Sequence, residues 1–208
     1  AYVTAGVLPS TVVADFQRRL AESDFTLPPG YELTFKGEKA ERTAAVDNLI
    51  ANAVVLFAMM IFTLVISFRS FRCALIVIVV GALAVGLGPL ALWLFGYPFG
   101  FMAIVGTMGL VGVAINDSIV VLAAIRENSA AQRGDVQELT DVVVGSTRHI
   151  VATTLTTMVG FTPLILGGGR FWPPLAVTIA GGVGGATILA LYFVPCLNRI
   201  FHRRSGQA

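Results

Sequence analysis

The sequence predicts a mainly α-helical polytopic membrane protein, with five transmembrane helices that follow a short β-α-β unit. Composition is the first reason, because 56% of the 208 residues are hydrophobic and only 12% are charged, against about 25% charged in soluble domains. The second reason is that the apolar residues gather in runs of about 20, the length that crosses a bilayer as a helix. The net charge of +2 is too small to indicate nucleic-acid binding.

Residues 1–45 precede the apolar runs and show a different pattern. Residues 2–5 are typical of a strand, residues 12–20 place apolar side chains on one face of a helix, and residues 31–35 alternate like a second strand. Such a unit is too small to bury a core of its own. We therefore expect residues 1–45 to be the C-terminal part of a larger α+β domain, and the chain to be the C-terminal piece of a larger protein.

The membrane spans and their orientation follow from the apolar runs and the arginines between them. Five segments qualify as spans, at about 49–68, 73–95, 99–125, 149–167 and 173–198. The connections on one side hold Arg69, Arg72, Arg126, Arg133, Arg148, Arg199, Arg203 and Arg204, and those on the other side hold Arg170. Positive residues accumulate in cytoplasmic loops. We therefore expect a transmembrane domain over 46–201, a cytoplasmic tail over 202–208, and residues 1–45 outside the cytoplasm.

The connection over residues 127–145 carries apolar residues on one helical face and charged residues on the other. This pattern predicts an amphipathic helix that lies on the cytoplasmic surface of the membrane.

Small residues in the spans predict close helix packing. Gly106, Gly109 and Gly112 share an arc of the third span with the polar pair Asn116 and Asp117, at about 100° per residue, so we expect this arc to face protein. In the fifth span, Gly181 and Gly185 have the small-xxx-small spacing of contacting membrane helices.

Asp117 is the only acidic residue inside the spans, which also contain no Lys or Arg. A carboxylate at this depth costs several kcal/mol unless it is paired, hydrated or protonated, so it marks a candidate for ion or proton handling. Asn116, Ser118 and, on the next span, Thr153 and Thr154 are its candidate hydrogen-bonding partners. The alternative is structural: an acid held by hydrogen bonds, and hydroxyls that bond a carbonyl of their own helix.

No pattern in the chain indicates an enzyme, a metal site or a cofactor. The two cysteines, Cys73 and Cys196, have no CxxC or histidine companion, so the sequence favours apolar packing for both.

A set of short motifs then points to a family. In chain order they are Asn116-Asp117-Ser118, Thr153-Thr154, Phe161-Thr162-Pro163-Leu164, Gly167-Gly168-Gly169, Trp172-Pro173-Pro174 and Val194-Pro195. Their order and spacing resemble the C-terminal end of a resistance-nodulation-division (RND) efflux permease. The resemblance implies that residues 1–45 end the second periplasmic porter domain and that the five spans are the last of twelve.

The same resemblance implies an activity, which is secondary active transport. Family members are homotrimers of the bacterial inner membrane that exchange hydrophobic or amphiphilic compounds for protons, together with a periplasmic adaptor and an outer-membrane channel. Thr153 matches the relay threonine of the family. Asn116 and Asp117 depart from the family pattern, since well-known members carry Lys and Asn there, so Asp117 is expected to share or take over the proton-carrying role.

Other readings stay open from the sequence. A protein-export accessory subunit of the same superfamily also has an Asn-Asp pair followed by an Arg-Glu-Asn run, which Arg126, Glu127 and Asn128 match. A lipid transporter with RND-like helices is another alternative, and a membrane anchor without transport activity would leave Asp117 unexplained.

Overall fold

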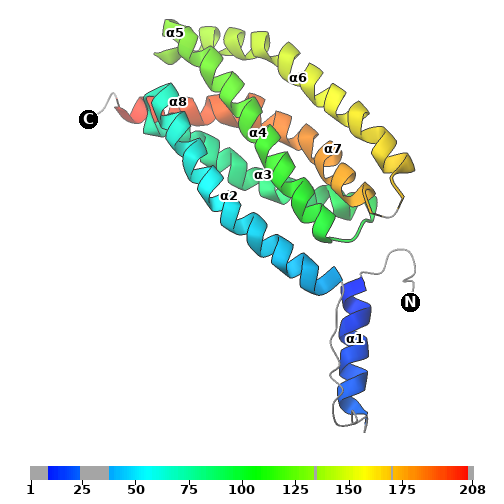
Figure 1. Cartoon of the computed structure of the whole chain (residues 1–208). Coiled ribbons are helices and arrows are strands. Elements are labelled where there is room, and N and C mark those ends of the chain that lie inside the picture. The colour runs from blue at the N-terminus through cyan, green and yellow to red at the C-terminus, as the bar shows by residue number, and fades with distance from the viewer. Residues whose placement is uncertain (1–8, 24–37, 134, 170, 206–208) are drawn as a thin grey trace. The chain divides into compact units, whose positions relative to one another are not determined.

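The computed structural model describes residues 9–23, 38–133, 135–169 and 171–205, and these residues form helices and short connections without a strand (Figure 1). The elements are α1 (Pro9–Glu22), α2 (Glu38–Phe68), α3 (Phe71–Phe95), α4 (Phe101–Glu127), α5 (Ser129–Gln132), α6 (Val136–Gly167), α7 (Pro173–Ile188), the π-helical η1 (Leu189–Phe193) and α8 (Val194–Ser205). The helix predicted over residues 12–20 is confirmed by α1. The strands predicted at residues 2–5 and 31–35 lie outside the described residues.

The chain divides into two compact units, residues 1–57 and residues 58–208. In the first unit, α1 carries Asp15, which accepts hydrogen bonds from Arg18 at 2.6 Å and from Arg19 at 2.9 Å on an exposed surface. Such surface ion pairs contribute little stability. The second unit holds most of the spans and the candidate site.

The predicted spans correspond to helices that are long and apolar enough to cross a membrane. These candidate spans are Ala51–Phe68, Phe71–Phe95, Phe101–Glu127, Val136–Gly167 and Pro173–Phe201. Four of them agree with their predicted segments within about three residues at each end, because an apolar run of about 20 residues is a strong signal for a membrane helix. The remaining span, Val136–Gly167, begins before its predicted start at residue 149. The prediction of a polytopic helical membrane protein is therefore confirmed.

The predicted connector over residues 127–145 is not a separate surface helix. Only α5 stands apart, and it begins at the cap residue Asn128, whose side-chain oxygen accepts hydrogen bonds from the amides of Ala130 (2.9 Å) and Ala131 (3.0 Å). A second cap, Asp135, then starts α6, which continues through residues 136–145 into the fourth span. Gly145 does not interrupt it, since a glycine inside a helix costs only about 1 kcal/mol.

The last span is one apolar run interrupted by a π-helical segment at Leu189–Phe193. Pro195 lies two residues after this segment. It has no amide hydrogen, so a regular α-helix would be disturbed at the preceding turn. The wider π turn accommodates the disturbance, and the Val194 amide bonds the carbonyl of Leu189.

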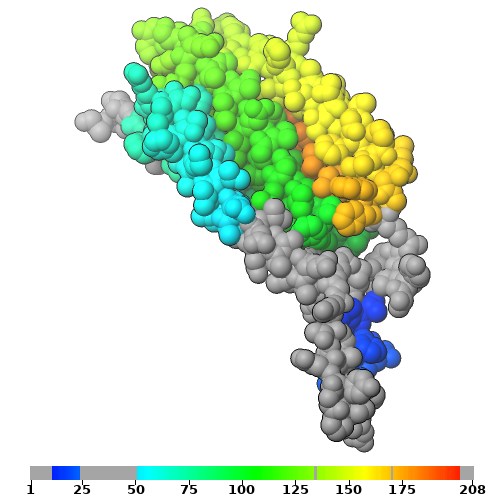
Figure 2. Space-filling model, in the orientation of Figure 1, coloured from blue at the N-terminus to red at the C-terminus, as the bar shows by residue number. Residues whose placement is uncertain are grey.

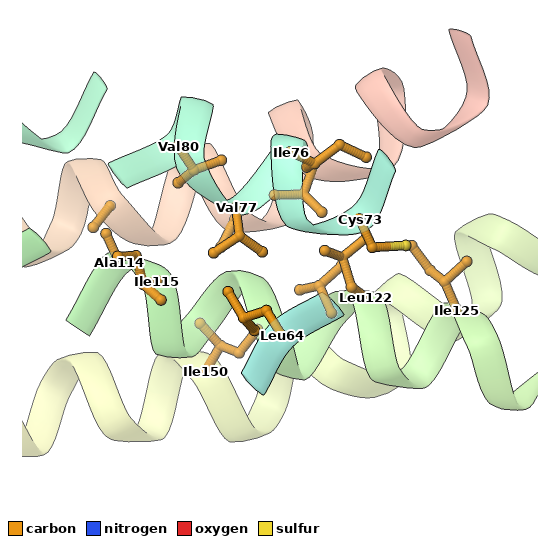
Figure 3. Packing of buried hydrophobic residues seen from close by; sticks show 14 of the residues in the cluster. Leu64, Cys73, Ile76, Val77, Val80, Ala114, Ile115, Leu122, Ile125 and Ile150 are labelled. Atoms are coloured by element: carbon orange, nitrogen blue, oxygen red, sulfur yellow. The ribbon is translucent and has the colours of Figure 1, made fainter. Parts of the chain in front are cut away.

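The core of the second unit lies where α3, α4 and α7 pack against one another. Fully buried residues include Ile76, Val77 and Val80 of α3 and Leu122 of α4. Figure 3 shows these side chains together with Ile150 of α6. The other side of α4 is not covered by this core, and Figure 2 shows α4 at the surface between α6 and the part of α2 from Ala58 onward.

Candidate functional site

Asp117 lies on the buried face of α4, and its side chain is 2% exposed. One turn before it on the same face is Ala114 and one turn after it is Val121, both 0% exposed and both part of the apolar core. Because α4 turns about 100° per residue, this face is set by the helix as a whole and not by Asp117. The packing of the apolar residues on this face of α4 thus places Asp117 inside the helix bundle.

The carboxyl group of Asp117 has an unsatisfied oxygen. Among the described residues, its Oδ2 atom is buried and has no hydrogen-bond partner, and no ion pair involves this side chain in that part of the chain. Buried polar oxygens are nearly always hydrogen-bonded, and an exception requires an explanation. A charged carboxylate in this place would cost several kcal/mol, so the arrangement suits a group that takes up and releases a proton.

The two neighbours of Asp117 in the sequence lie in different surroundings. Ser118 is fully buried, and its hydroxyl donates to the carbonyl of Ala114 at 2.7 Å. Asn116 is exposed among the described residues, so within this chain it does not share the buried face of Asp117, and the expectation that it faces protein stays a prediction. The two residues differ because consecutive residues of an α-helix lie about 100° apart, and the covering helices reach only one of the two directions.

The threonines of α6 also lie in different surroundings. Thr153 is exposed, and its hydroxyl donates to the carbonyl of His149 at 3.0 Å. Thr154 is buried, bonds the carbonyl of Ile150 at 2.9 Å and shares a second, short hydrogen bond with the hydroxyl of Thr187 on α7. Neither threonine bonds Asp117 among the described residues, so their relay role stays a prediction.

Replacing Thr187 with valine is expected to loosen the contact between α6 and α7 without unfolding the bundle. Valine keeps the shape of threonine but removes the hydroxyl that joins the two helices. Interhelical hydrogen bonds in membrane proteins contribute about 0.6 kcal/mol on average. The measurement is the thermal stability of the purified protein in detergent. Thr156→Val serves as the matched control, because Thr156 is exposed and its hydroxyl donates to the carbonyls of Ala152 and Thr153 on α6; an equal loss in both variants would contradict the expectation.

Glycines hold helices close at three of the five positions named from the sequence. A Cβ atom on Gly106 would lie 2.9 Å from the carbonyl oxygen of Leu175. One on Gly181 would lie 2.7 Å from Cβ of Ala91, and one on Gly185 would lie 2.8 Å from a methyl group of Leu87. These distances are shorter than van der Waals contact, so α7 approaches α3 and α4 more closely than larger residues allow.

The other two glycines make weaker contacts or none. A Cβ atom on Gly109 would lie 3.3 Å from Cδ1 of Ile179, and one on Gly112 would have no atom within 4 Å. Gly112 is exposed, like Asn116. Of the three glycines on α4, Gly106 makes the closest contact with another helix. Gly112 makes none in the described structure, because it lies about 120° around the helix from Gly106.

Buried hydroxyls that the sequence reading missed lie at the contacts of α7. Thr178 is fully buried, and Thr178 and Thr107 would both touch a Cβ atom added to Gly88 of α3, at 2.8 Å. Thr187 lies three residues after Gly184 and Thr178 four residues before Gly182. A spacing of three or four residues places each threonine on the same helical face as a glycine, and this spacing could have identified both threonines as contact residues from the sequence.

Comparison with known proteins shows which family this chain resembles. The model of the AcrB/AcrD/AcrF family matches residues 1–202. The cobalt-zinc-cadmium resistance protein CzcA of Cupriavidus metallidurans is 30% identical over 198 residues, which cover 90% of this chain and 18% of that protein. Protein HelA of Legionella pneumophila is 31% identical over 207 residues, covering 96% of this chain and 19% of that protein.

A multidrug relative and a solved structure are similar over different extents. The multidrug resistance protein MdtC of Salmonella arizonae is 33% identical over 123 residues, covering 57% of this chain and 12% of that protein. The crystal structure of a heavy metal efflux pump superposes with a TM-score of 0.72 at 22% identity, covering 94% of this chain and 20% of that one. The chain spans about a fifth of the length of CzcA and HelA.

Proposed function

This chain belongs to the AcrB/AcrD/AcrF family of RND permeases, and we propose that the transporter containing it is a proton-driven efflux pump in which Asp117 carries protons. The observation that supports this most directly is the carboxyl group of Asp117, buried in a membrane-spanning helix with an unpartnered Oδ2. An acid with only a structural role would stabilise the fold little more than an apolar residue at the same position. Burial disfavours the charged form of the acid, which suits a group that takes up a proton inside the membrane.

The proposed relay needs movement between α4 and α6. In the described conformation, the hydroxyls of Ser118, Thr153 and Thr154 all bond carbonyls of their own helices. When Asp117 loses its proton, its carboxylate competes for such donors, and Asn116, Thr153 and Thr154 are the proposed ones. Loss of the proton thus changes the packing of α4 against its neighbours. This local change drives transport when it shifts the equilibrium between two conformations of the transporter.

The setting of the pump follows from the family and from the charge distribution. We place the transporter in the bacterial inner membrane as a homotrimer, in contact with a periplasmic adaptor and an outer-membrane channel. The N-terminal part of the chain is periplasmic and the C-terminus cytoplasmic, in keeping with the arginines that gather at one end of the spans.

Two classes of substrate are candidates. Amphiphilic compounds, the class expected from the sequence, are supported by the similarity to MdtC over 57% of the chain. Divalent metal cations are supported by the similarity to CzcA, which extends over 90% of the chain. The printed name of CzcA refers to cobalt, zinc and cadmium. The described residues hold no group of three or more His, Cys, Asp or Glu suited to a metal ion.

Proton flux in proteoliposomes tests the proposal and separates the two substrate classes. The transporter is reconstituted with a pH-sensitive dye inside the vesicles, and zinc, cobalt or an amphiphilic cation is added under an imposed pH gradient. We expect dissipation of the gradient that depends on one of these substrates. A transporter that moves no protons with either class would contradict the proposal and favour the protein-export or lipid-transport alternative.

A further inference from the structure

A pocket of about 290 Å³ lies at one end of the spans, where α2 ends, α3 begins and α4 ends. Three of its lining residues are arginines, Arg69, Arg72 and Arg126, and none is acidic. Phe201, which is partly exposed, contributes apolar surface to its wall. The pocket therefore combines positive charge with apolar surface at the level where the membrane-spanning segments end.

Arg126 is held in place from several directions. It is half-buried, and its guanidinium donates to the sulfur of Cys73 at 3.6 Å and lies 6.0 Å from the ring centre of Phe68. Its backbone carbonyl accepts a hydrogen bond from the side chain of Gln132. These neighbours leave most of the five N–H donors of the planar guanidinium for an anion, and this fork matches the oxygens of a phosphate group.

The backbone of the α2–α3 turn adds to the positive potential of the pocket. Ser70 is the residue before the first turn of α3, and its side chain makes no capping hydrogen bond. The amides at the start of a helix attract anions. Arg69, beside it, has a φ angle of 45°, a left-handed conformation that favours glycine. An arginine here thus places a charged side chain where the backbone alone favours glycine.

We propose that this pocket binds the phosphate group of an anionic phospholipid from the surrounding membrane leaflet. Its position at the ends of the spans is the level of lipid headgroups, and basic pockets between membrane helices bind such headgroups. Its volume is that of about ten water molecules, enough for a phosphate and part of the attached glycerol. Phe201 lies beside the lipid's apolar part. The proposal is independent of the substrate and of the role of Asp117.

Native mass spectrometry of the full transporter, titrated with phosphatidylglycerol or phosphatidylcholine in detergent, tests the proposal. We expect the wild type to bind phosphatidylglycerol more tightly, and Arg69→Gln to weaken this binding about fivefold, the effect of one basic residue near a membrane surface. Arg69→Gly is expected to weaken it equally while relaxing the backbone. Arg69 is exposed, so its replacement leaves the apolar core intact.

Arg133→Gln is the matched control, because Arg133 is exposed on the neighbouring connection and does not line the pocket. It is expected to bind phosphatidylglycerol like the wild type. Equal losses in Arg133→Gln and Arg69→Gln, or no loss in Arg69→Gln and Arg69→Gly, would overturn the proposal. A final arm adds inorganic phosphate to the wild type with phosphatidylglycerol bound. Retention of phosphatidylglycerol supports a lipid site, and its complete displacement at millimolar phosphate would overturn the proposal in favour of a soluble anion.

Discussion

Replacing Asp117 with asparagine is expected to reduce proton-driven export to the background of vesicles without transporter, while the variant is still made and inserted. Asparagine has nearly the same shape but cannot take up and release a proton. Asp117 is 2% exposed and its Oδ2 has no partner among the described residues, so no polar contact in the described structure is lost. The expected loss is therefore one of coupling and not of folding.

The measurement is substrate-dependent proton flux in proteoliposomes, with the thermal stability of each variant determined in detergent. Asp141→Asn is the matched control, since it makes the same chemical change at an exposed position on α6. It is expected to transport like the wild type. Near-normal export by Asp117→Asn would refute the assignment of Asp117 as a proton carrier, and a large drop in its melting temperature would indicate a structural acid instead.

Replacing Gly106 with alanine is expected to give the largest loss of stability among single methyl additions to α4. The added Cβ atom would lie 2.9 Å from the carbonyl oxygen of Leu175 and 2.9 Å from Cβ of Thr178. Neither the backbone nor a Cβ atom moves without shifting α7 as a whole. Overpacking of this kind typically costs about 1–3 kcal/mol, which is measured as a lower melting temperature in detergent.

Gly112→Ala provides the control on the same helix. A Cβ atom at Gly112 would meet no atom within 4 Å, and alanine favours a helix over glycine by about 1 kcal/mol. This variant is expected to be as stable as the wild type or more stable. Equal stability of Gly106→Ala and Gly112→Ala would contradict the inference that α4 and α7 approach too closely at Gly106 for a side chain.

The membrane helices were predictable because their signal is local. An apolar run of about 20 residues forms a helix in a bilayer whatever its neighbours are, since every backbone group must be hydrogen-bonded within the segment. The extent of α6 was less predictable. Residues 136–145 have the amphipathic pattern of a surface helix, yet they continue into the span, because nothing in the sequence between them breaks the helix.

The surroundings of Asp117 were predictable only in part. Its apolar segment and the absence of a nearby cation are visible in the sequence. Which neighbours share its buried face is not visible there, because this depends on how α4 is rotated relative to α3 and α7. The structure buries Ser118 and leaves Asn116 exposed, and it joins Thr154 to Thr187 across 33 residues of sequence.

The membrane helices, and the presence in one of them of an acid that is costly to bury, are both visible in the sequence. Both follow from composition along a single segment, where the bilayer is the only partner that matters. Three features emerge only from the packed helices. Among the described residues, Asp117 has an unpartnered oxygen, Gly106 and not Gly112 lies at a helix contact, and Arg69 and Arg126 line one pocket. These depend on contacts between helices, and the rotation of each helix is selected by the packing of the whole bundle.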